Sequence, residues 1–289
     1  MIVISQGVIA GLIVMLCWGC SDFILTIPIR KIGTLKTILI RNIVSILLVA
    51  PVGFHLFFTD RMAIPLINLL IILTSSFLFI LAYYFFMKGF EIGSISLVSP
   101  IGGAYSIITV MLALMFLGET LSNLKMLAVS LMILGVFFTS SDVTKLKNIK
   151  SQKGLKEAFL AMVGFGLSMF VLGFVSKLLD SIILFAYATL SQAFFFVVLS
   201  ILKGGRYQKG DLNIKLFLIF VLQATIVNVG WFAYIYGVGQ DLVSIVTPIS
   251  SLLPGVTVIL ALIFYKEKLV LNQKLGIFGI LAGGFFISI

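Results

Sequence analysis

Charged residues are scarce in this sequence. Of its 289 residues only 10% carry a charge, whereas 61% are hydrophobic, and a soluble domain usually has about a quarter charged residues. Because so few polar side chains cannot cover a folded chain in water, we expect lipid to be its solvent. The composition therefore predicts a polytopic membrane protein.

The chain also has few of the residues that metal sites and catalytic triads need. It contains one histidine, His55, which we interpret as an interfacial side chain, and two cysteines, Cys17 and Cys20. No phosphate-binding loop of the form G-x-x-x-x-G-K-[ST] occurs. We therefore expect no catalytic residue, no metal and no cofactor. Any driving energy then comes from a gradient or from a separate chain.

Long apolar runs dominate what is present. A membrane-crossing helix needs about 20 mostly apolar residues, and ten such runs follow one another along the chain. They lack the period-two alternation of barrel strands, so we expect an all-α protein with ten transmembrane helices. The expected spans are 3–27, 35–58, 64–87, 93–117, 124–141, 156–176, 181–202, 213–236, 242–265 and 272–289.

Lysine and arginine are distributed unevenly between the connections. Sixteen of the 20 lie in the odd-numbered connections, three lie in the even-numbered ones, and Arg41 lies within a span. We interpret the net charge of +10 as a topology signal and not as a nucleic-acid-binding surface. The positive-inside rule predicts cytoplasmic odd connections and external termini. We expect the chain to reside in the cell (cytoplasmic) membrane.

An internal repeat sets the expected architecture. When the sequence is shifted by 148 residues, residues 89–141 align with 237–289 without a gap, and 18 of 53 positions are identical. Each half then contains five spans. Since five is odd, the second half must enter the membrane upside down. We predict two inverted five-helix repeats, 1–144 and 156–289, joined by a basic linker at 145–155.

Inverted repeats are typical of secondary transporters, whose substrate binds near the midplane between the halves. A duplicated bundle without a transport role is the alternative. Pro100 and Pro248 are equivalent under the shift and are expected to act as hinges. Glu119 and Glu267 are also equivalent and are expected to be structural anchors or gate pairs.

Short motifs in the spans carry a resemblance to a known family. They are Trp18-Gly19, Arg41, and the pattern L-V-S-P…L-G-E-T-L…G-V, which recurs as I-V-T-P…Y-K-E-K-L…G-G. Together with the ten spans and the repeat, they resemble the EamA-type permeases of the drug/metabolite transporter superfamily. The resemblance implies an inverted-repeat fold that moves small metabolites by alternating access. Two features depart from it: Gly164–Phe174 contains no Trp to match Trp18, and family members are often thought of with cytoplasmic termini.

Cys17 and Cys20 form a C-x-x-C pair within the first span. This is the spacing of thioredoxin-like redox sites. Thiol exchange needs a thiolate, which apolar burial disfavours, and a membrane redox relay would need a second cysteine pair. We interpret both residues as inert buried thiols. A membrane-embedded thiol redox enzyme is the competing hypothesis.

Asp22 and Arg41 are the candidate charged pair within the membrane. Asp22 shares a helix face with Trp18 and lies about 12 Å inside the span end at 1.5 Å per residue. A carboxylate there costs about 2.5–3.5 kcal/mol, and such groups usually pair or face a cavity. The pair either binds a charged group of the substrate or carries a coupling proton, or it is a structural ion pair that locks the first two helices.

Aromatic and amide side chains complete the candidate site. Under the shift of 148, Tyr83 maps to Trp231, and Asn228 shares a helix face with Trp231. We expect them to line a midplane cavity that stacks on an apolar or aromatic part of a solute. The alternative is an interfacial aromatic belt. The full set of candidate substrate-binding residues is Trp18, Asp22, Arg41, Tyr83, Tyr105, Gln192, Asn228 and Trp231.

These features favour a secondary transporter or permease for a small organic metabolite, amino-acid-like or aromatic, and not an enzyme. Its expected partners are the lipid bilayer and the metabolite; a proton or sodium as coupling ion is permitted by the sequence but not required. An ion channel would need a ring of charged groups or a filter motif, and the sequence contains neither.

Overall fold

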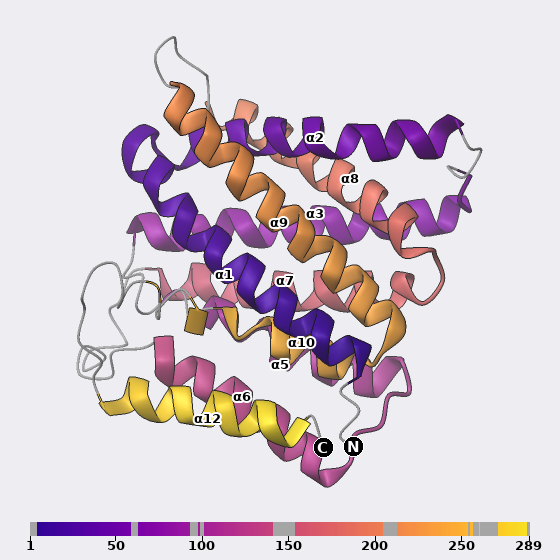
Figure 1. The fold of residues 1–289 in the computed structure, drawn as a ribbon, viewed down its shortest axis with the longest axis vertical. Helices are drawn as coiled ribbons and strands as arrows, with labels where there is room; N and C mark the ends of the chain where they lie inside the picture. The colour runs from indigo at the N-terminus through magenta and orange to yellow at the C-terminus, as the bar shows by residue number, and fades with distance from the viewer. Residues whose placement is uncertain are drawn as a thin grey trace.

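The computed structural model shows the chain as a bundle of helices (Figure 1). It describes residues 5–58, 63–92, 98, 101–140, 154–204, 213–253, 255–256, 260 and 271–287. The helices are α1 (Gln6–Ile32), α2 (Thr34–Phe58), α3 (Leu66–Ile92), α5 (Tyr105–Phe116), α6 (Asn123–Ser140), α7 (Leu155–Ser176), α8 (Ser181–Leu202), α9 (Ile214–Gln240), α10 (Val243–Ser250) and α12 (Leu271–Ile287). The all-α fold class is confirmed.

Local sequence fixes where several helices begin. Ser5, Asp180 and Asn213 each precede a helix, and their side-chain oxygens accept hydrogen bonds from backbone N–H groups of the first turn. These residue types supply the acceptor that a helix start otherwise lacks. Gly33 is the single residue between α1 and α2, and its φ of 84° is one that glycine adopts at little cost.

Six of the described helices are long and apolar enough to cross a membrane: α1, α2, α3, α7, α8 and α9. Two shorter apolar helices cover Ile101–Phe116 and Asn123–Gly135. Large hydrophobic side chains such as Leu47, Phe116 and Leu202 are exposed, at 65%, 68% and 77%. A surface of this kind matches lipid rather than water, as a polytopic membrane protein requires.

The fourth and ninth predicted spans are interrupted within their described residues. A turn at Ala104 breaks the fourth, and a turn at Ser251–Leu252 breaks the ninth; the two turns are equivalent under the shift of 148. Pro248 lies inside α10 and lacks the N–H that a helix interior would use. Broken helices occur in membranes where they line a cavity or are buried in protein.

Some predicted features fall outside the described residues. They are Pro100, Glu267 and most of the linker, 145–153. The hinge role of Pro100 and Pro248 and the bounds of the two halves stay predictions.

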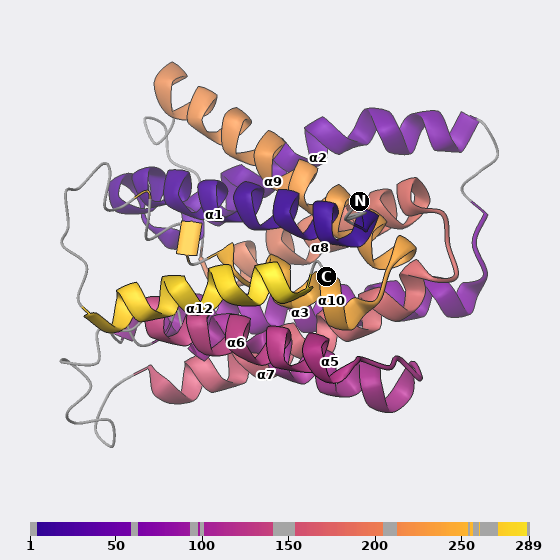
Figure 2. The ribbon, with the colours of Figure 1, turned by 60° about the horizontal axis from the view of Figure 1, so that its bottom comes forward.

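The helix contacts of the first half are repeated in the second half, as a pseudo-two-fold relation between the halves requires. α1 packs against α9 as α7 packs against α3, while α2 pairs with α8, α5 with α10 and α6 with α12 (Figures 1 and 2). Close helix contacts at glycines are repeated in the same way. A Cβ at Gly19 would lie 2.6 Å from Val256 Cβ, and a Cβ at Gly166 would lie 2.6 Å from Ile108 Cβ. The second half therefore repeats the first in structure.

The helix ends gather at two ends of the bundle, left and right in Figure 1. At the left, α1, α3, α6 and α8 end and α2, α7, α9 and α12 begin, near the basic residues Lys36, Lys88, Lys156 and Lys203. We call this the basic end. The connections after α2, α5, α7 and α9 lie at the right, and because Glu119 follows α5 there, we call it the Glu119 end.

Candidate substrate-binding site

Asp22 lies on the side of α1 that faces the other helices, yet its side chain is exposed. Leu16 is 52% exposed and lies on the outer side of α1, whereas Val14, Trp18 and Leu25 on the opposite side are buried. Asp22 follows Trp18 by four residues and so belongs to the buried side, yet it is exposed. Since lipid contacts the other side of α1, this exposure indicates accessible space inside the bundle.

The surroundings of Asp22 come from three other helices. Arg41 of α2 is 8% exposed and interacts electrostatically with the Asp22 carboxylate. The Arg41 guanidinium also interacts with the Tyr83 hydroxyl of α3. Tyr105 of α5 also interacts electrostatically with the Asp22 carboxylate. The fold thus brings four of the eight predicted site residues together, although they are spread over more than 80 positions of sequence.

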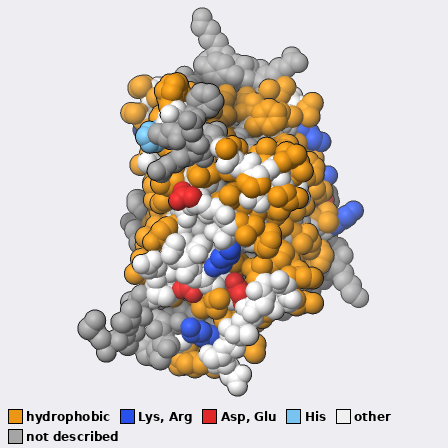
Figure 3. Space-filling model, turned by 90° about the vertical axis from the view of Figure 1, so that its right-hand side faces the viewer, with side chains coloured by type: hydrophobic (Ala, Val, Ile, Leu, Met, Phe, Trp, Pro, Cys, Tyr) orange, Lys and Arg blue, Asp and Glu red, His pale blue; other side chains and the backbone are white. Residues whose placement is uncertain are grey.

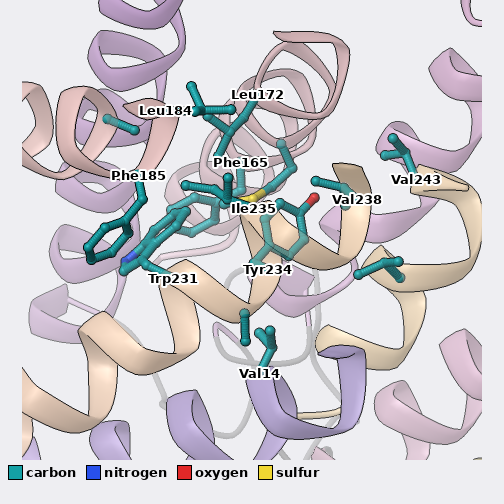
Figure 4. Close-up of a cluster of buried hydrophobic side chains, with 14 of the residues drawn as sticks. Val14, Phe165, Leu172, Leu184, Phe185, Trp231, Tyr234, Ile235, Val238 and Val243 are labelled. Carbon is teal, nitrogen blue, oxygen red and sulfur yellow. The ribbon is translucent and has the colours of Figure 1, made fainter. Parts of the chain in front are cut away.

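An aromatic cluster adjoins this charged group. The rings of Trp18 and Trp231 are 4.9 Å apart between centroids, and those of Trp18 and Tyr234 are 5.7 Å apart and stacked. Phe79 of α3 packs edge-on against Trp231 at 5.1 Å. Figure 4 shows Trp231 and Tyr234 side by side on α9. Stacked and edge-on rings of this kind can bind a flat or apolar ligand group.

Phe165 of α7 occupies the place that is equivalent to Trp18. Its ring packs against Phe79 at 5.3 Å, Phe86 at 5.8 Å and Tyr105 at 6.1 Å. Phe165 was not predicted as a site residue, because a phenylalanine does not match the Trp-Gly motif of the first span. A signal was present: with a shift of 147 instead of 148, Trp18-Gly19 aligns with Phe165-Gly166.

Several buried polar atoms lack a hydrogen-bond partner among the residues that the structure describes. They include Arg41 Nε and the Tyr105 hydroxyl, and both residues interact electrostatically with Asp22. An unsatisfied buried polar group costs about 1–3 kcal/mol, so a ligand or water that bonds these atoms would relieve that cost. The indole Nε1 of Trp18 also lacks a partner, but it faces the backbone of α9, where a Cβ at Gly230 would lie 2.7 Å from it.

Asn228 and Gln192 are buried polar side chains of α9 and α8. Asn228 donates to Ser45 Oγ at 3.0 Å and accepts from it at 3.1 Å, so its amide is used to join α9 to α2. Gln192 is buried on α8 with 7% of its surface exposed. A similar cross-helix bond joins Gln223 to Ser21 at 2.7 Å.

The two cysteines lie on the packed part of α1. Both are free thiols and half-buried. A Cβ at Gly230 would lie 3.1 Å from the Cβ of Cys17, which places this thiol-bearing residue at the crossing of α1 and α9. Such a crossing favours small side chains, which gives Cys17 a packing role.

Comparisons with known proteins agree with this architecture. The model of the EamA-like transporter family matches residues 5–141 and again residues 152–289. Uncharacterized protein MJ1333.1 of Methanocaldococcus jannaschii is 36% identical over 75 residues, which are 26% of this chain and 55% of that protein, so the chain spans about half of its length.

One solved crystal structure superposes with a TM-score of 0.77 at 11% identity and covers 98% of this chain and 96% of its own. At that identity the likeness shows the fold alone.

Proposed function

Because the chain belongs to the EamA-like transporter family, we propose that it carries a small organic metabolite across the cell membrane by alternating access. It is a multi-pass membrane transporter and not an enzyme. The two repeats supply the two similar units that such a mechanism needs, since one can close an end of the bundle while the other opens the opposite end.

We further propose that the metabolite is amino-acid-like or aromatic. The observation that carries this proposal is the exposed carboxylate of Asp22 on the buried face of α1. Asp22 would accept from an ammonium group, and the free Nε–H of Arg41 would donate to a carboxylate. The rings of Trp18, Trp231 and Phe165 would pack against the apolar part of the ligand.

Asp22 is also the residue that supports ion coupling. An acidic side chain within a span is typical of proton relays and ion pathways. A proton or sodium ion would then compete with the ammonium group of the metabolite for the same carboxylate. Pro248 in α10 and its equivalent Pro100 are proposed as the hinges for the change between states.

A metabolite panel tests this function. Purified protein is first screened by thermal shift against amino acids, amines, aromatic acids and sugars, and ligands that raise the melting temperature are then tested for uptake into liposomes. We expect stabilisation and saturable uptake of zwitterionic or aromatic compounds. Uptake of sugars alone would contradict the proposed substrate class, and absence of uptake for every stabilising ligand would contradict transport.

Replacing both cysteines separates the transporter from the thiol redox alternative. We expect Cys17→Ser with Cys20→Ser to transport within about twofold of the wild type, because serine is close in size to cysteine and transport uses no thiolate. Initial rates of liposome uptake measure this. A redox enzyme would lose its activity completely in the same variant.

A further inference from the structure

Glu119 caps a helix that belongs to the other repeat. Only 8% of its surface is exposed, and its carboxylate oxygens accept hydrogen bonds from the backbone N–H groups of Val243 at 2.8 Å and Ser244 at 2.9 Å. These are the first two residues of α10, and the preceding Leu242 provides no side-chain cap. A carboxylate of the first repeat therefore occupies the positive end of a helix of the second.

Lys177 strengthens the same region. Its ammonium group donates to the backbone carbonyl of Asp241, which follows α9, and it interacts electrostatically with the carboxylates of Glu119 and Asp241. These three residues join the ends of α5, α7, α9 and α10. Figure 3 views this end and shows a few acidic and basic side chains near the middle of the face, among apolar and other uncharged side chains.

Between this charged cluster and Asp22 the helices pack tightly against one another. Val14 of α1, Tyr234 of α9 and Val243 of α10 have no exposed surface, and Leu172 of α7 has 1% exposed (Figure 4). Asp22, two turns along α1 toward the basic end, is exposed. The space beside Asp22 is therefore sealed from the Glu119 end by apolar side chains of both repeats.

We propose that the contact between the Glu119 carboxylate and the N-terminus of α10 is the gate that holds the Glu119 end closed. The inference rests on the alternating access proposed above. To expose Asp22 at this end, α10 has to move away from α1 and α7, which removes the Glu119 carboxylate oxygens from two backbone N–H groups. Bonds to charged acceptors are stronger than neutral ones, so the contact favours the closed state.

Site-directed labelling tests the gate. In a background of Cys17→Ser and Cys20→Ser, Val14→Cys places a thiol within the seal, and a membrane-impermeant maleimide is added separately to each side of sealed vesicles without substrate. We expect Glu119→Ala to raise the labelling rate about tenfold to a hundredfold from the side that the Glu119 end faces. Glu119→Gln, which keeps one acceptor oxygen, should give a smaller rise.

Asp180→Asn is the matched control. Asp180 is also a capping carboxylate at the Glu119 end, but it accepts from Ile182 and Ile183 of its own helix, α8, and so does not link the repeats. Its labelling rate should equal that of the parent. A rise in this control as large as in Glu119→Ala, or no rise in either Glu119 variant, would overturn the gate.

The labelling needs no transported substrate, so it is independent of the metabolite panel. A protein that carries no metabolite but labels as expected would contradict the proposed function alone. A protein that transports normally in both Glu119 variants, without a change in labelling, would contradict the gate alone.

Discussion

Neutralising Asp22 and Arg41 together abolishes transport without unfolding the protein: we expect Asp22→Asn with Arg41→Gln to lower the initial rate of liposome uptake by about 100-fold or more. Each charged hydrogen bond to the substrate contributes about 1.5–3 kcal/mol, and both would be lost. The fold tolerates the double change because no unpaired charge remains in the membrane. Melting temperature in detergent measures the folded state alongside uptake.

The single variants distinguish a binding pair from a structural lock. If the charges of Asp22 and Arg41 stabilise the packing of α1 against α2, neutralising one of them alone leaves the other charge without its counterpart within the membrane and lowers the stability of the protein. If the pair only joins α1 to α2, each single variant has a lower melting temperature and the double variant transports at the wild-type rate. That result would contradict the proposed role in binding.

The matched control removes another buried polar pair. The hydroxyls of Ser75 and Ser168 bond each other between α3 and α7, and each also donates to the backbone carbonyl of the other residue. Their double alanine variant should transport within about threefold of the wild type, since both hydroxyls are removed together and neither is left without its partner.

Alanine at Gly166 or Gly19 has the largest expected effect on stability. At Gly166 the new Cβ would lie 2.6 Å from Ile108 Cβ and 2.9 Å from the Tyr105 carbonyl; at Gly19 it would lie 2.9 Å from the Leu253 carbonyl. Backbone atoms cannot move aside without separating the helices, and overpacking of this kind costs about 1–3 kcal/mol. We expect both variants to melt at a clearly lower temperature in detergent.

Gly53→Ala is the control for the glycine variants. A Cβ there would contact Leu190 at 3.5 Å, an ordinary packing distance, so its melting temperature should match the wild type or exceed it slightly. If Gly166→Ala and Gly53→Ala have the same melting temperature, the close contact between α5 and α7 does not determine the stability of the protein.

Much of the architecture follows from sequence because it depends on solvent and on local pattern. Apolar runs of about 20 residues predict spans wherever they occur, and the aligned Pro248 and Glu119 motifs reveal the duplication without any coordinates. The alignment was less informative for the opening helices. There the shift is 147, so Phe165 was not recognised as the counterpart of Trp18, and only packing against Phe79 and Tyr105 revealed it.

Individual site residues were harder to assign, because their roles depend on partners far away in the chain. Asn228 was predicted as a ligand-binding amide, but in the structure it is bonded to Ser45, 183 positions away. Glu119 lies near Lys125 in sequence, yet its carboxylate bonds the backbone of Val243, 124 positions away. Neither partner is visible in a local pattern.

The sequence by itself therefore determined the membrane environment, the helical spans and the two repeats, because each depends on composition or on similarity along the chain. Only the tertiary structure decided which polar groups are bonded within the protein and which face open space. That choice separates the bonded amide of Asn228 from the exposed side chain of Asp22 and the unbonded Nε of Arg41, and it is made by the helices that pack around each side chain.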